Sequence, residues 1–463
     1  MKMKRRKFIN QTTIAGLSLG GFSFVNSCET EPQKNHHTYM GGFKGKPISQ
    51  IKAAFVGVGD RGRVHARNFK SFKGTEIVGI CDLYETRVKD TIRSLNIEKS
   101  IKGYWGKDNL WIKMIEETKP DVVFISTNWD NHAKMAIKSM ELGSHAFVEV
   151  PLANTIEDLW RIVNTSEKNR KHCMMLENVN YGREELMFLN ICRKGLIGDL
   201  IHGEASYIHD LRAQMFQKDK TYFDNQPGTG SWRTRQYAKN IGNLYPTHGL
   251  GPVAQYMSLA RKEDNFKKIV SLSSPSKGRA LMAKKYFEKG HEWNNLKFRT
   301  GDINTSIIQS TYGKTIMIQW DETSPRPYTR HNLIQGTLGA LAGFPTRVFF
   351  DSKENALSID HLPWIEGEDL SDIYEKYDHP LYKKLNEKTA DSGHGGMDGI
   401  MMYRVIECLQ KGEPLDQNVY EGAFWSAVTP LSAKSIDSGG NPQNFPDFTR
   451  GKWKDTEPLG IVF

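Results

Sequence analysis

The sequence predicts an α/β protein in which an N-terminal, doubly wound parallel sheet precedes an α+β domain with a large open mixed or antiparallel sheet. Three observations support this prediction. Buried strands alternate with helices between residues 51 and 149, which is typical of a parallel sheet with helices on both faces. A glycine-rich turn follows the first of these strands. Beyond about residue 180, apolar and polar residues alternate along the strands, which indicates a sheet with one open face.

The first half supplies the elements of the parallel sheet in order. Strands are predicted over 51–56, 76–81, 122–126 and 145–149, and helices through Phe69, over 84–95 and over about 132–142. A helix over 156–170, with Thr155 as its N-cap, and a short strand over 174–178 follow. The alternating strands of the second half include 201–208 and 315–320. A chain of 463 residues is too long for one ordinary core, so two domains are expected.

The N-terminus predicts export. A basic stretch over 4–7, which contains Arg5 and Arg6, and the apolar stretch over 14–25 resemble a twin-arginine signal. This apolar stretch is too short to span a bilayer comfortably. Residues 25–28 loosely match a lipoprotein cleavage box, with Cys28 as the acylated residue. We therefore expect a signal over 1–28, a polar linker over 29–48, and a protein of the periplasm or one anchored by lipid to the cell envelope.

Composition excludes several functions. The formal net charge is +10, but five of the positive charges lie within the first seven residues, and the others form no Lys/Arg stripe. Nucleic acid is therefore not an expected partner. The five cysteines form no CxxC pair and show no metal-ligand spacing, so neither a disulfide framework nor a metal site is predicted.

The turn Gly57-x-Gly59-x-x-Gly62 lies directly between a predicted strand and a predicted helix. Glycines there allow a tight turn, close approach of the backbone to a pyrophosphate, and packing of the helix on the strand. Asp82 follows 20 residues after Gly62, at the end of the second strand. A carboxylate at that place accepts hydrogen bonds from ribose hydroxyls and repels a 2′-phosphate, so the motif predicts NAD rather than NADP. The alternatives are a glycine turn without a ligand and a plain turn role for Asp82.

Two later loops also follow strands of this sheet. In the loop over 126–132, we expect Trp129 to cover the nicotinamide ribose and Asn131 and His132 to bond to it. The alternative for His132 is a cap on the following helix. After the strand over 145–149 comes Glu149-Val150-Pro151.

These motifs together resemble the Gfo/Idh/MocA oxidoreductases, which have a Rossmann domain with GxGxxG, a strand-end Asp and a Glu-x-Pro. Their dehydrogenases usually carry a catalytic lysine between the Glu and the Pro, whereas this chain has Val150. Four further strings are similar to glycoside hydrolase family 109, the NAD-dependent α-N-acetylgalactosaminidases. They are 171–178, 203–212, 230–234 and 242–252, the last containing Tyr245-Pro246-Thr247-His248-Gly249. The resemblance covers residues from about 50 to at least Tyr328, and it implies an NAD-binding Rossmann domain over 49–178 and a substrate-binding domain over 179–463.

The resemblance also implies two sets of ligand-binding residues. The set for NAD comprises Asp60, Arg61, Asp82, Trp129, Asp130, Asn131, His132, Glu149, Val150 and Asn178 beside the three glycines. The set for the sugar comprises Tyr207, Arg233, Tyr245, Pro246, Thr247, His248 and Tyr328. Aromatic rings stack on sugar faces and Arg binds hydroxyl or amide oxygens, so these residue types suit a polar sugar pocket. His209 and Asp210 have no apparent third ligand, and no metal is expected.

A glycosidase that uses two carboxylates needs a pair flanking the glycosidic oxygen, and the sequence shows no clear pair near the sugar loops. The resemblance implies another route to release of terminal N-acetylgalactosamine: oxidation at C3, loss of the C2 proton, elimination of the aglycone, addition of water and reduction. Tyr245 and His248 are the predicted acid/base residues, because His titrates near neutrality and Tyr relays protons. Two alternatives are an NAD-dependent sugar dehydrogenase and a non-catalytic sugar-binding lipoprotein.

Overall fold

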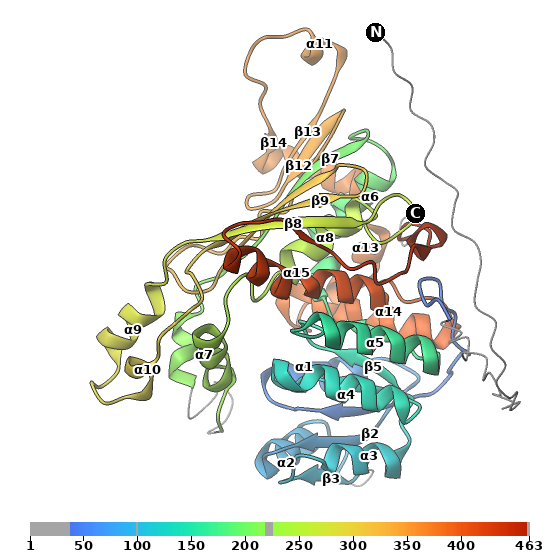
Figure 1. Ribbon diagram of the computed structural model, residues 1–463. Coiled ribbons are helices and arrows are strands. Elements are labelled where there is room, and N and C mark those ends of the chain that lie inside the picture. The colour runs from blue at the N-terminus through green and yellow to red at the C-terminus, as the bar shows by residue number, and fades with distance from the viewer. Residues whose placement is uncertain (1–37, 99–100, 218–225, 461–463) are drawn as a thin grey trace, which may run out of the picture. The chain divides into compact units, whose positions relative to one another are not determined.

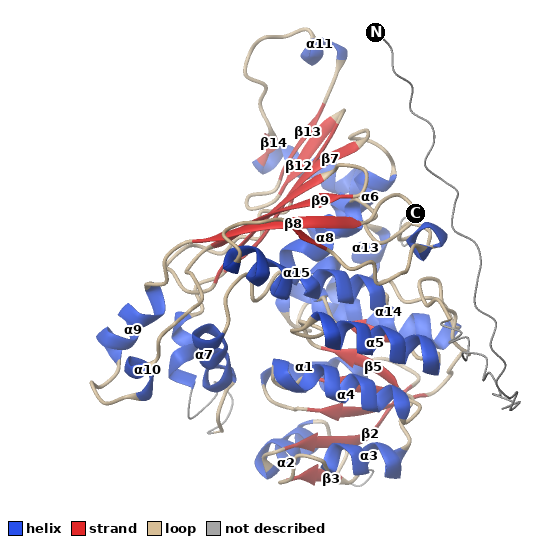
Figure 2. Ribbon diagram, viewed as in Figure 1, coloured by secondary structure: helices blue, strands red, loops and turns tan. Residues whose placement is uncertain are grey.

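The computed structural model describes residues 38–98, 101–217 and 226–460, and these belong to one compact unit, His37–Phe463 (Figures 1 and 2). The predicted signal with Cys28, and the predicted linker as far as residue 37, lie outside the described residues. Among the helices that are described, none has the length and apolar character needed to cross a membrane.

The first sheet is parallel, as predicted, and it has six strands in the order β3-β2-β1-β4-β5-β6. Its strands are β1 (Ile51–Val56), β2 (Thr75–Asp82), β3 (Gly103–Trp105), β4 (Val122–Ile125), β5 (His145–Val148) and β6 (Cys173–Met175). The connecting helices are α1 (Asp60–Lys70), α2 (Glu85–Ser94), α3 (Leu110–Thr118), α4 (Trp129–Glu141) and α5 (Ile156–Asn169). The strand order reverses between β1 and β4, and ligands of doubly wound sheets bind outside the carboxyl ends of the strands at such a point.

Continuous apolar runs make the centre of this sheet. All residues of β4 and β5 are buried, and the Phe55 ring stacks on the Phe124 ring of the neighbouring strand with 4.9 Å between ring centroids. The predicted N-cap of α5 is confirmed, because the Thr155 hydroxyl oxygen accepts a hydrogen bond from the Asp158 backbone N–H at 3.1 Å.

The sequence prediction missed two elements and misjudged two others. It skipped β3 and α3, since β3 is only three residues long and buries only Tyr104. Helix α4 begins at Trp129, three residues before the predicted start, because Asn128 is its N-cap. The strand expected over 174–178 ends at Met175, and the chain turns into the short 3₁₀ helix η1 (Asn178–Tyr181).

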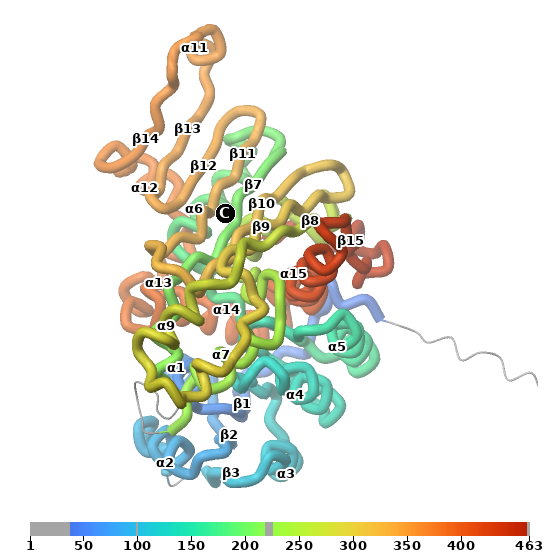
Figure 3. The backbone as a smooth tube through the Cα atoms, turned by 60° about the vertical axis from the view of Figure 1, so that its left-hand side comes forward, coloured from blue at the N-terminus to red at the C-terminus, as the bar shows by residue number. Residues whose placement is uncertain are grey.

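The second sheet is mixed and nine-stranded, with the order β14-β13-β12-β11-β7-β10-β9-β8-β15 (Figure 3). Strand β10 runs parallel to β7, and the other neighbours are antiparallel. Burial alternates along β9, where Ser306 and Ile308 are buried and Ile307 is exposed, so the predicted open face is confirmed. The strands are β7 (Leu200–Ile208), β8 (Phe266–Ser273), β9 (Asn304–Ser310), β10 (Thr315–Asp321), β11 (Leu333–Gly336), β12 (Gly339–Ala342), β13 (Arg347–Phe350), β14 (Ile365–Glu366) and β15 (Gln443–Asn444).

Helices of the second half connect the two sheets. Helix α15 (Val419–Asp437) contacts β8 of the second sheet as well as α5 and β6 of the first. The other helices are α6 (Arg183–Arg193), α7 (Thr229–Lys239), α8 (Thr247–Tyr256), α9 (Gly278–Tyr286), α10 (Glu292–Asn295), α11 (Lys353–Ala356), α12 (Ser371–Tyr377), α13 (Pro380–Thr389) and α14 (Met397–Lys411), with short 3₁₀ helices at Arg212–Gln217, Gly367–Leu370, His394–Gly396 and Lys452–Asp455.

The segment over 38–48 contains no helix or strand, and it packs on the last helices. The Met40 backbone N–H donates to the Tyr420 hydroxyl at 3.0 Å, and the Ile48 N–H donates to the Leu409 carbonyl oxygen at 3.0 Å. These bonds tie the beginning of the described chain to α14 and α15.

Candidate functional site

The glycine turn after β1 leaves no room for a side chain at two of its three glycines, Gly57 and Gly62. Gly57 has a φ of +82°, and a Cβ there would lie 2.5 Å from the Ser126 carbonyl oxygen. A Cβ at Gly62 would lie 1.8 Å from the Gly57 carbonyl oxygen, so helix α1 packs directly on the turn. At Gly59 the nearest atom would be a guanidinium nitrogen of Arg87 at 3.4 Å, so a Cβ there would make only ordinary contact. The turn therefore has the shape of a phosphate cradle at a helix N-terminus.

A cavity of about 320 Å³ adjoins this turn. Residues from both halves of the chain line it. Many of the predicted residues are among them: Gly57, Gly59, Asp60, Arg61, Asp82, Trp129, Asn131, His132, Glu149, Val150, Arg233 and Tyr245. Gly62, Asp130, Asn178, Tyr207, Pro246, Thr247, His248 and Tyr328 are not among its lining residues. The residues present fit a dinucleotide, because a glycine cradle, a helix N-terminus and a strand-end carboxylate border one cavity.

Asp82 is fixed at the end of β2 by the backbone. Its Oδ2 accepts from the Val58 N–H at 2.9 Å, and its Oδ1 accepts from the Tyr84 N–H at 3.0 Å. A carboxylate oxygen has two lone-pair sites, so each oxygen retains capacity for a ribose hydroxyl.

Trp129 joins the cavity to the sugar loops. Its ring meets that of Trp232 edge-on at 5.0 Å and stacks on that of Tyr245 at 5.8 Å. The Arg233 guanidinium lies 4.9 Å from the Trp129 ring centroid and 4.8 Å from that of Tyr245. Asp130, which does not line the cavity, accepts a hydrogen bond from the Gln236 amide at 2.9 Å.

His132 is fully buried, and both of its ring nitrogens lie near backbone carbonyl oxygens. Its Nδ1 lies 2.7 Å from the Pro151 carbonyl oxygen, and its Nε2 lies 3.1 Å from that of Thr127. Burial lowers the pKa of His132, so the ring is neutral near pH 7. A neutral imidazole has one N–H, so His132 donates to only one of these two carbonyl oxygens, and its contact with NAD stays a prediction.

Arg61 connects the cofactor cavity to helix α14. Its Nε donates to Glu149 at 3.0 Å, and its terminal nitrogens donate to the two oxygens of Asp398 at 2.8 and 3.1 Å. Asp398 also accepts from the Asn178 amide at 2.8 Å, while Glu149 contacts His65 at 2.6 Å. Burial is the largest single influence and would raise the pKa values of Glu149 and Asp398. The Arg61 charge and the hydrogen bonds from His65 to Glu149 and from His394 and Arg61 to Asp398 together outweigh burial, and they hold both pKa values well below their ordinary range.

The predicted sugar-binding rings form one cluster. Tyr207, near the end of β7, lies 5.1 Å from the Tyr245 ring, 5.0 Å from the His248 ring and 6.1 Å from the Tyr328 ring. Tyr245 and His248 lie 4.9 Å apart at the start of α8. Burial raises the pKa values of Tyr207 and Tyr245, so both hydroxyls are protonated near pH 7. Pro246 and Thr247 hold the turn into α8, and Thr247 is buried there.

Tyr328 is the outermost ring of this cluster. It is 41% exposed, and its hydroxyl accepts a hydrogen bond from Arg330 at 2.7 Å. Arg330 in turn donates to the buried Glu185 at 2.7 Å.

Sequence reasoning missed two buried carboxylates behind the cluster. Glu177 Oε1 lies 2.6 Å from Nδ1 of His248 and accepts from the Val179 N–H at 3.1 Å. Because Nδ1 faces a carboxylate, the proton sits on Nδ1, and within the described residues Nε2 has no hydrogen-bond partner. Glu322 accepts from the Tyr237 hydroxyl and lies 4.0 Å from Arg233. Both carboxylates have no exposed surface, so they orient other side chains and do not face the cavity.

His209 is a further neighbour that the prediction considered only as a metal ligand. Its Nδ1 lies 3.0 Å from the Tyr207 hydroxyl, and its ring meets that of Tyr328 edge-on at 5.0 Å. The part of the chain that the structure describes contains no group of three or more His, Cys, Asp or Glu residues that could hold a metal ion.

Comparison with known proteins agrees with this geometry. Residues 51–177 match the oxidoreductase family with an NAD-binding Rossmann fold, and residues 181–455 match the glycosyl hydrolase 109 C-terminal domain. The chain is 51% identical to glycosyl hydrolase family 109 protein 1 of Akkermansia muciniphila, over 99% of this chain and 98% of that protein. It is 46% identical to the alpha-N-acetylgalactosaminidase of Shewanella oneidensis, over 99% of this chain and 98% of that protein.

A solved structure shows the same fold. An NAD binding oxidoreductase of Klebsiella pneumoniae superposes with a TM-score of 0.63 at 14% identity, over 86% of this chain and 99% of that one. The predictions of an NAD cofactor and of an enzyme are confirmed by the matched families. The chain therefore belongs to glycoside hydrolase family 109, with the NAD-binding Rossmann domain of the Gfo/Idh/MocA oxidoreductases at its N-terminal end.

Proposed function

We propose that this enzyme hydrolyses terminal α-linked N-acetylgalactosamine from glycans by oxidation, elimination, addition and reduction, with no net redox change. One observation carries the proposal: Tyr245 lines the cofactor cavity, and its ring lies 4.9 Å from the ring of His248. A sugar bound at these rings would therefore border the cofactor. The name of the Shewanella oneidensis relative supports the sugar and its α-linkage.

When bound in the cavity, NAD would supply an acceptor for the C3 hydride of the sugar, which returns to C3 at the end, while the O3 hydroxyl proton passes to solvent; the C3 carbonyl acidifies the proton at C2. In the proposal His248 removes that proton through Nε2, because Glu177 holds the Nδ1–H. Tyr245 keeps its phenolic proton and donates a hydrogen bond to a sugar oxygen. Loss of the C2 proton lets the aglycone leave C1 and take up a proton as its alcohol; water then adds its oxygen at C1, and a proton returns to C2.

The carboxylates argue against direct displacement at C1. That mechanism needs two carboxyl groups on either side of the glycosidic bond. The two that lie behind the ring cluster, Glu177 and Glu322, are fully buried and bonded to His248 and Tyr237. Glu177 orients His248 instead, and Glu322 contacts Tyr237 and Arg233.

Hydrolysis in heavy water tests the mechanism. A panel of α- and β-linked aryl N-acetylhexosaminides is incubated with the purified enzyme without added NAD. We expect cleavage of the α-N-acetylgalactosaminide, deuterium at C2 of the released sugar and no accumulation of NADH. Product sugar incubated alone with the enzyme controls for later exchange. Accumulation of NADH with oxidised sugar would indicate a dehydrogenase, and sugar protiated at C2 would indicate direct displacement.

Variants of the His248–Glu177 pair test the roles of the residues. His248→Ala should reduce kcat by about 10² to 10⁴ with little change in KM, since it removes a proton acceptor used in the transition state. Glu177→Gln should reduce kcat by a smaller factor, because the amide permits the other tautomer of His248. His202→Ala is the control, because His202 lies near the other end of β7 and its Nδ1 contacts Thr315 at 2.8 Å.

We also propose export by the twin-arginine route, followed by residence in the periplasm or lipid attachment through Cys28. The basic pair and the apolar stretch of the leader support it. That route carries folded proteins, so NAD would be loaded in the cytoplasm. Replacement of both Arg5 and Arg6 by Lys should retain the protein in the cytoplasm, as fractionation would show. Unchanged export would contradict this route.

A further inference from the structure

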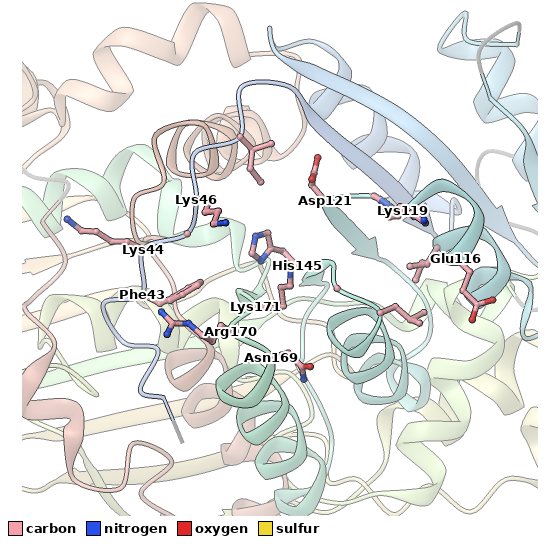
Figure 4. A pocket seen from close by; sticks show the side chains of 16 residues that line it. Phe43, Lys44, Lys46, Glu116, Lys119, Asp121, His145, Asn169, Arg170 and Lys171 are labelled. Carbon is pink, nitrogen blue, oxygen red and sulfur yellow. The ribbon is translucent and has the colours of Figure 1, made fainter. Parts of the chain in front are cut away.

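A second cavity, of about 910 Å³, lies at the opposite edge of the first sheet. Asp121 and His145, which line it, stand where β4 and β5 begin, whereas the cofactor cavity lies where the strands end. The ends of α3, α4 and α5 and the segment over 43–48 form its other walls (Figure 4). This cavity is thus separate from the catalytic site, and the proposed function does not use it.

Positive charge dominates the lining. Five basic side chains surround the cavity, namely Lys44, Lys46, Lys119, Arg170 and Lys171, against two carboxylates, Glu116 and Asp121. Asp121 already accepts a hydrogen bond from the Lys52 backbone N–H at 2.8 Å. Within the described residues, none of the five cations forms an ion pair or a hydrogen bond through its side chain, although Arg170 lies 5.6 Å from the Phe43 ring.

Helix ends account for only part of this charge. Lys119 and Arg170 are the left-handed C-caps of α3 and α5, and cations stabilise the negative ends of helices. Lys44 and Lys46 belong to the segment over 38–48, which has no helix, so no helix end explains them. In Figure 4 they lie on the same side of the cavity as His145, Arg170 and Lys171.

His145 adds a buried hydrogen-bond donor to the wall of this cavity. Its Nδ1 accepts from the His172 backbone N–H at 2.9 Å, so the proton of the neutral ring must sit on Nε2. Burial, with the neighbouring His172 and Lys171, lowers the pKa of His145 well below its ordinary value, so the ring is neutral. The His172 ring lies between Phe43 and His145, 4.8 and 4.9 Å from them, and this packing holds the segment against the sheet.

We propose that this cavity is a binding site for a phosphate group, carried either by a soluble phosphate compound or by a phospholipid headgroup. Phosphate oxygens accept charge-assisted hydrogen bonds from ammonium, guanidinium and imidazole N–H groups, and all three stand in this wall. A phosphate bound here would neutralise cations that the protein leaves unpaired. The site lies away from the sugar rings, so its ligand is not the glycan undergoing hydrolysis.

Titration of the full-length enzyme with inorganic phosphate, at constant ionic strength set by chloride, tests the site by calorimetry. We expect saturable binding that the double variant Lys44→Glu, Lys46→Glu weakens by at least about tenfold, because two charged contacts reverse sign. The control carries Lys267→Glu and Lys353→Glu, two exposed lysines of the second half. It should bind phosphate as the wild type does, and turnover of the aryl glycoside should be unchanged in both variants.

Sedimentation with vesicles distinguishes the two sources of phosphate. Vesicles of phosphatidylcholine are compared with vesicles that also contain phosphatidic acid. Retention on the acidic vesicles that is lost only in the Lys44/Lys46 variant identifies a lipid headgroup, whereas calorimetric binding without such retention identifies a soluble phosphate compound. The proposal is overturned if neither assay detects binding, or if both double variants weaken binding equally.

Discussion

Replacing Asp398 by Asn should destabilise the fold and loosen NAD. The Asp398 side chain has no exposed surface. Its carboxylate accepts hydrogen bonds from both terminal nitrogens of Arg61 and from the Asn178 amide, and it lies 2.8 Å from Nδ1 of His394. Removal of one partner of a buried ion pair costs about 3–5 kcal/mol, because the other charge stays buried. The Arg61 side chain is 30% exposed and keeps its hydrogen bond to Glu149, so solvent partly screens its unpaired charge. We therefore expect the free energy of unfolding to fall by about 3 kcal/mol.

Urea denaturation at pH 7, followed by tryptophan fluorescence and far-UV circular dichroism, measures this loss. The free energy of unfolding is taken only where the two probes coincide. The matched control is Asp210→Asn, which breaks the more exposed pair with Arg212 and should cost about 0–1 kcal/mol. The NAD content of the Asp398→Asn enzyme should also fall, because Asn178 loses its carboxylate partner.

The loss of unfolding free energy caused by Asp398→Asn should depend on pH. The folded-state pKa of Asp398 lies below the unfolded value of about 3.9, so its stabilisation is present above that pH and is lost as the pH falls through the folded pKa. The difference between wild type and Asp398→Asn should therefore be constant from about pH 5 upward and shrink below pH 4. A cost at pH 7 no larger than that of Asp210→Asn would refute the reasoning.

Three other variants follow from the same structure. Gly62→Ala should abolish NAD retention and lower the melting temperature, because its Cβ would lie 1.8 Å from the Gly57 carbonyl oxygen; normal NAD content after purification would contradict the close packing. Asp82→Ala should weaken NAD binding and reduce discrimination against NADP, as fluorescence titration with both would reveal, and tighter binding of NADP by the wild type would overturn the cofactor prediction. Arg330→Met should raise KM and destabilise the fold by about 3 kcal/mol, because it leaves Glu185 buried without its cation, whereas a change confined to kcat would place Arg330 in the chemistry.

The sequence predicted the first sheet well because its signals are local. Strand β1, the turn with Gly57 and Gly62, and strand β2 follow one another within about thirty residues, and each is marked by an apolar run or a glycine. The open face of the second sheet could be predicted equally well, because the alternation of apolar and polar residues occurs within a single strand. Strand β3 was missed because three residues on a sheet edge carry no periodic pattern.

The supports of the candidate site could not be predicted in this way. Glu177 meets His248 across 71 positions of the chain, and Asp398 meets Arg61 across 337. No local pattern distinguishes these acids from surface carboxylates, because their burial depends on the packing of the two halves. The glycine motif and the resemblance to a family identified many residues that line the cavity, but the buried groups that orient them became visible only in the structure.

The bonds from Met40 and Ile48 to the last long helices have a consequence for biosynthesis. The ribosome completes α15, at Asp437, long after the six strands of the first sheet have emerged. Until then β6 and α5 lack the helix that covers them, and the Met40 N–H lacks its hydrogen-bond partner Tyr420. A nascent chain therefore exposes an apolar surface until nearly all of it has been synthesised, and such surfaces favour aggregation. Products truncated before residue 419 should consequently depend on chaperones even though their nucleotide-binding half is complete.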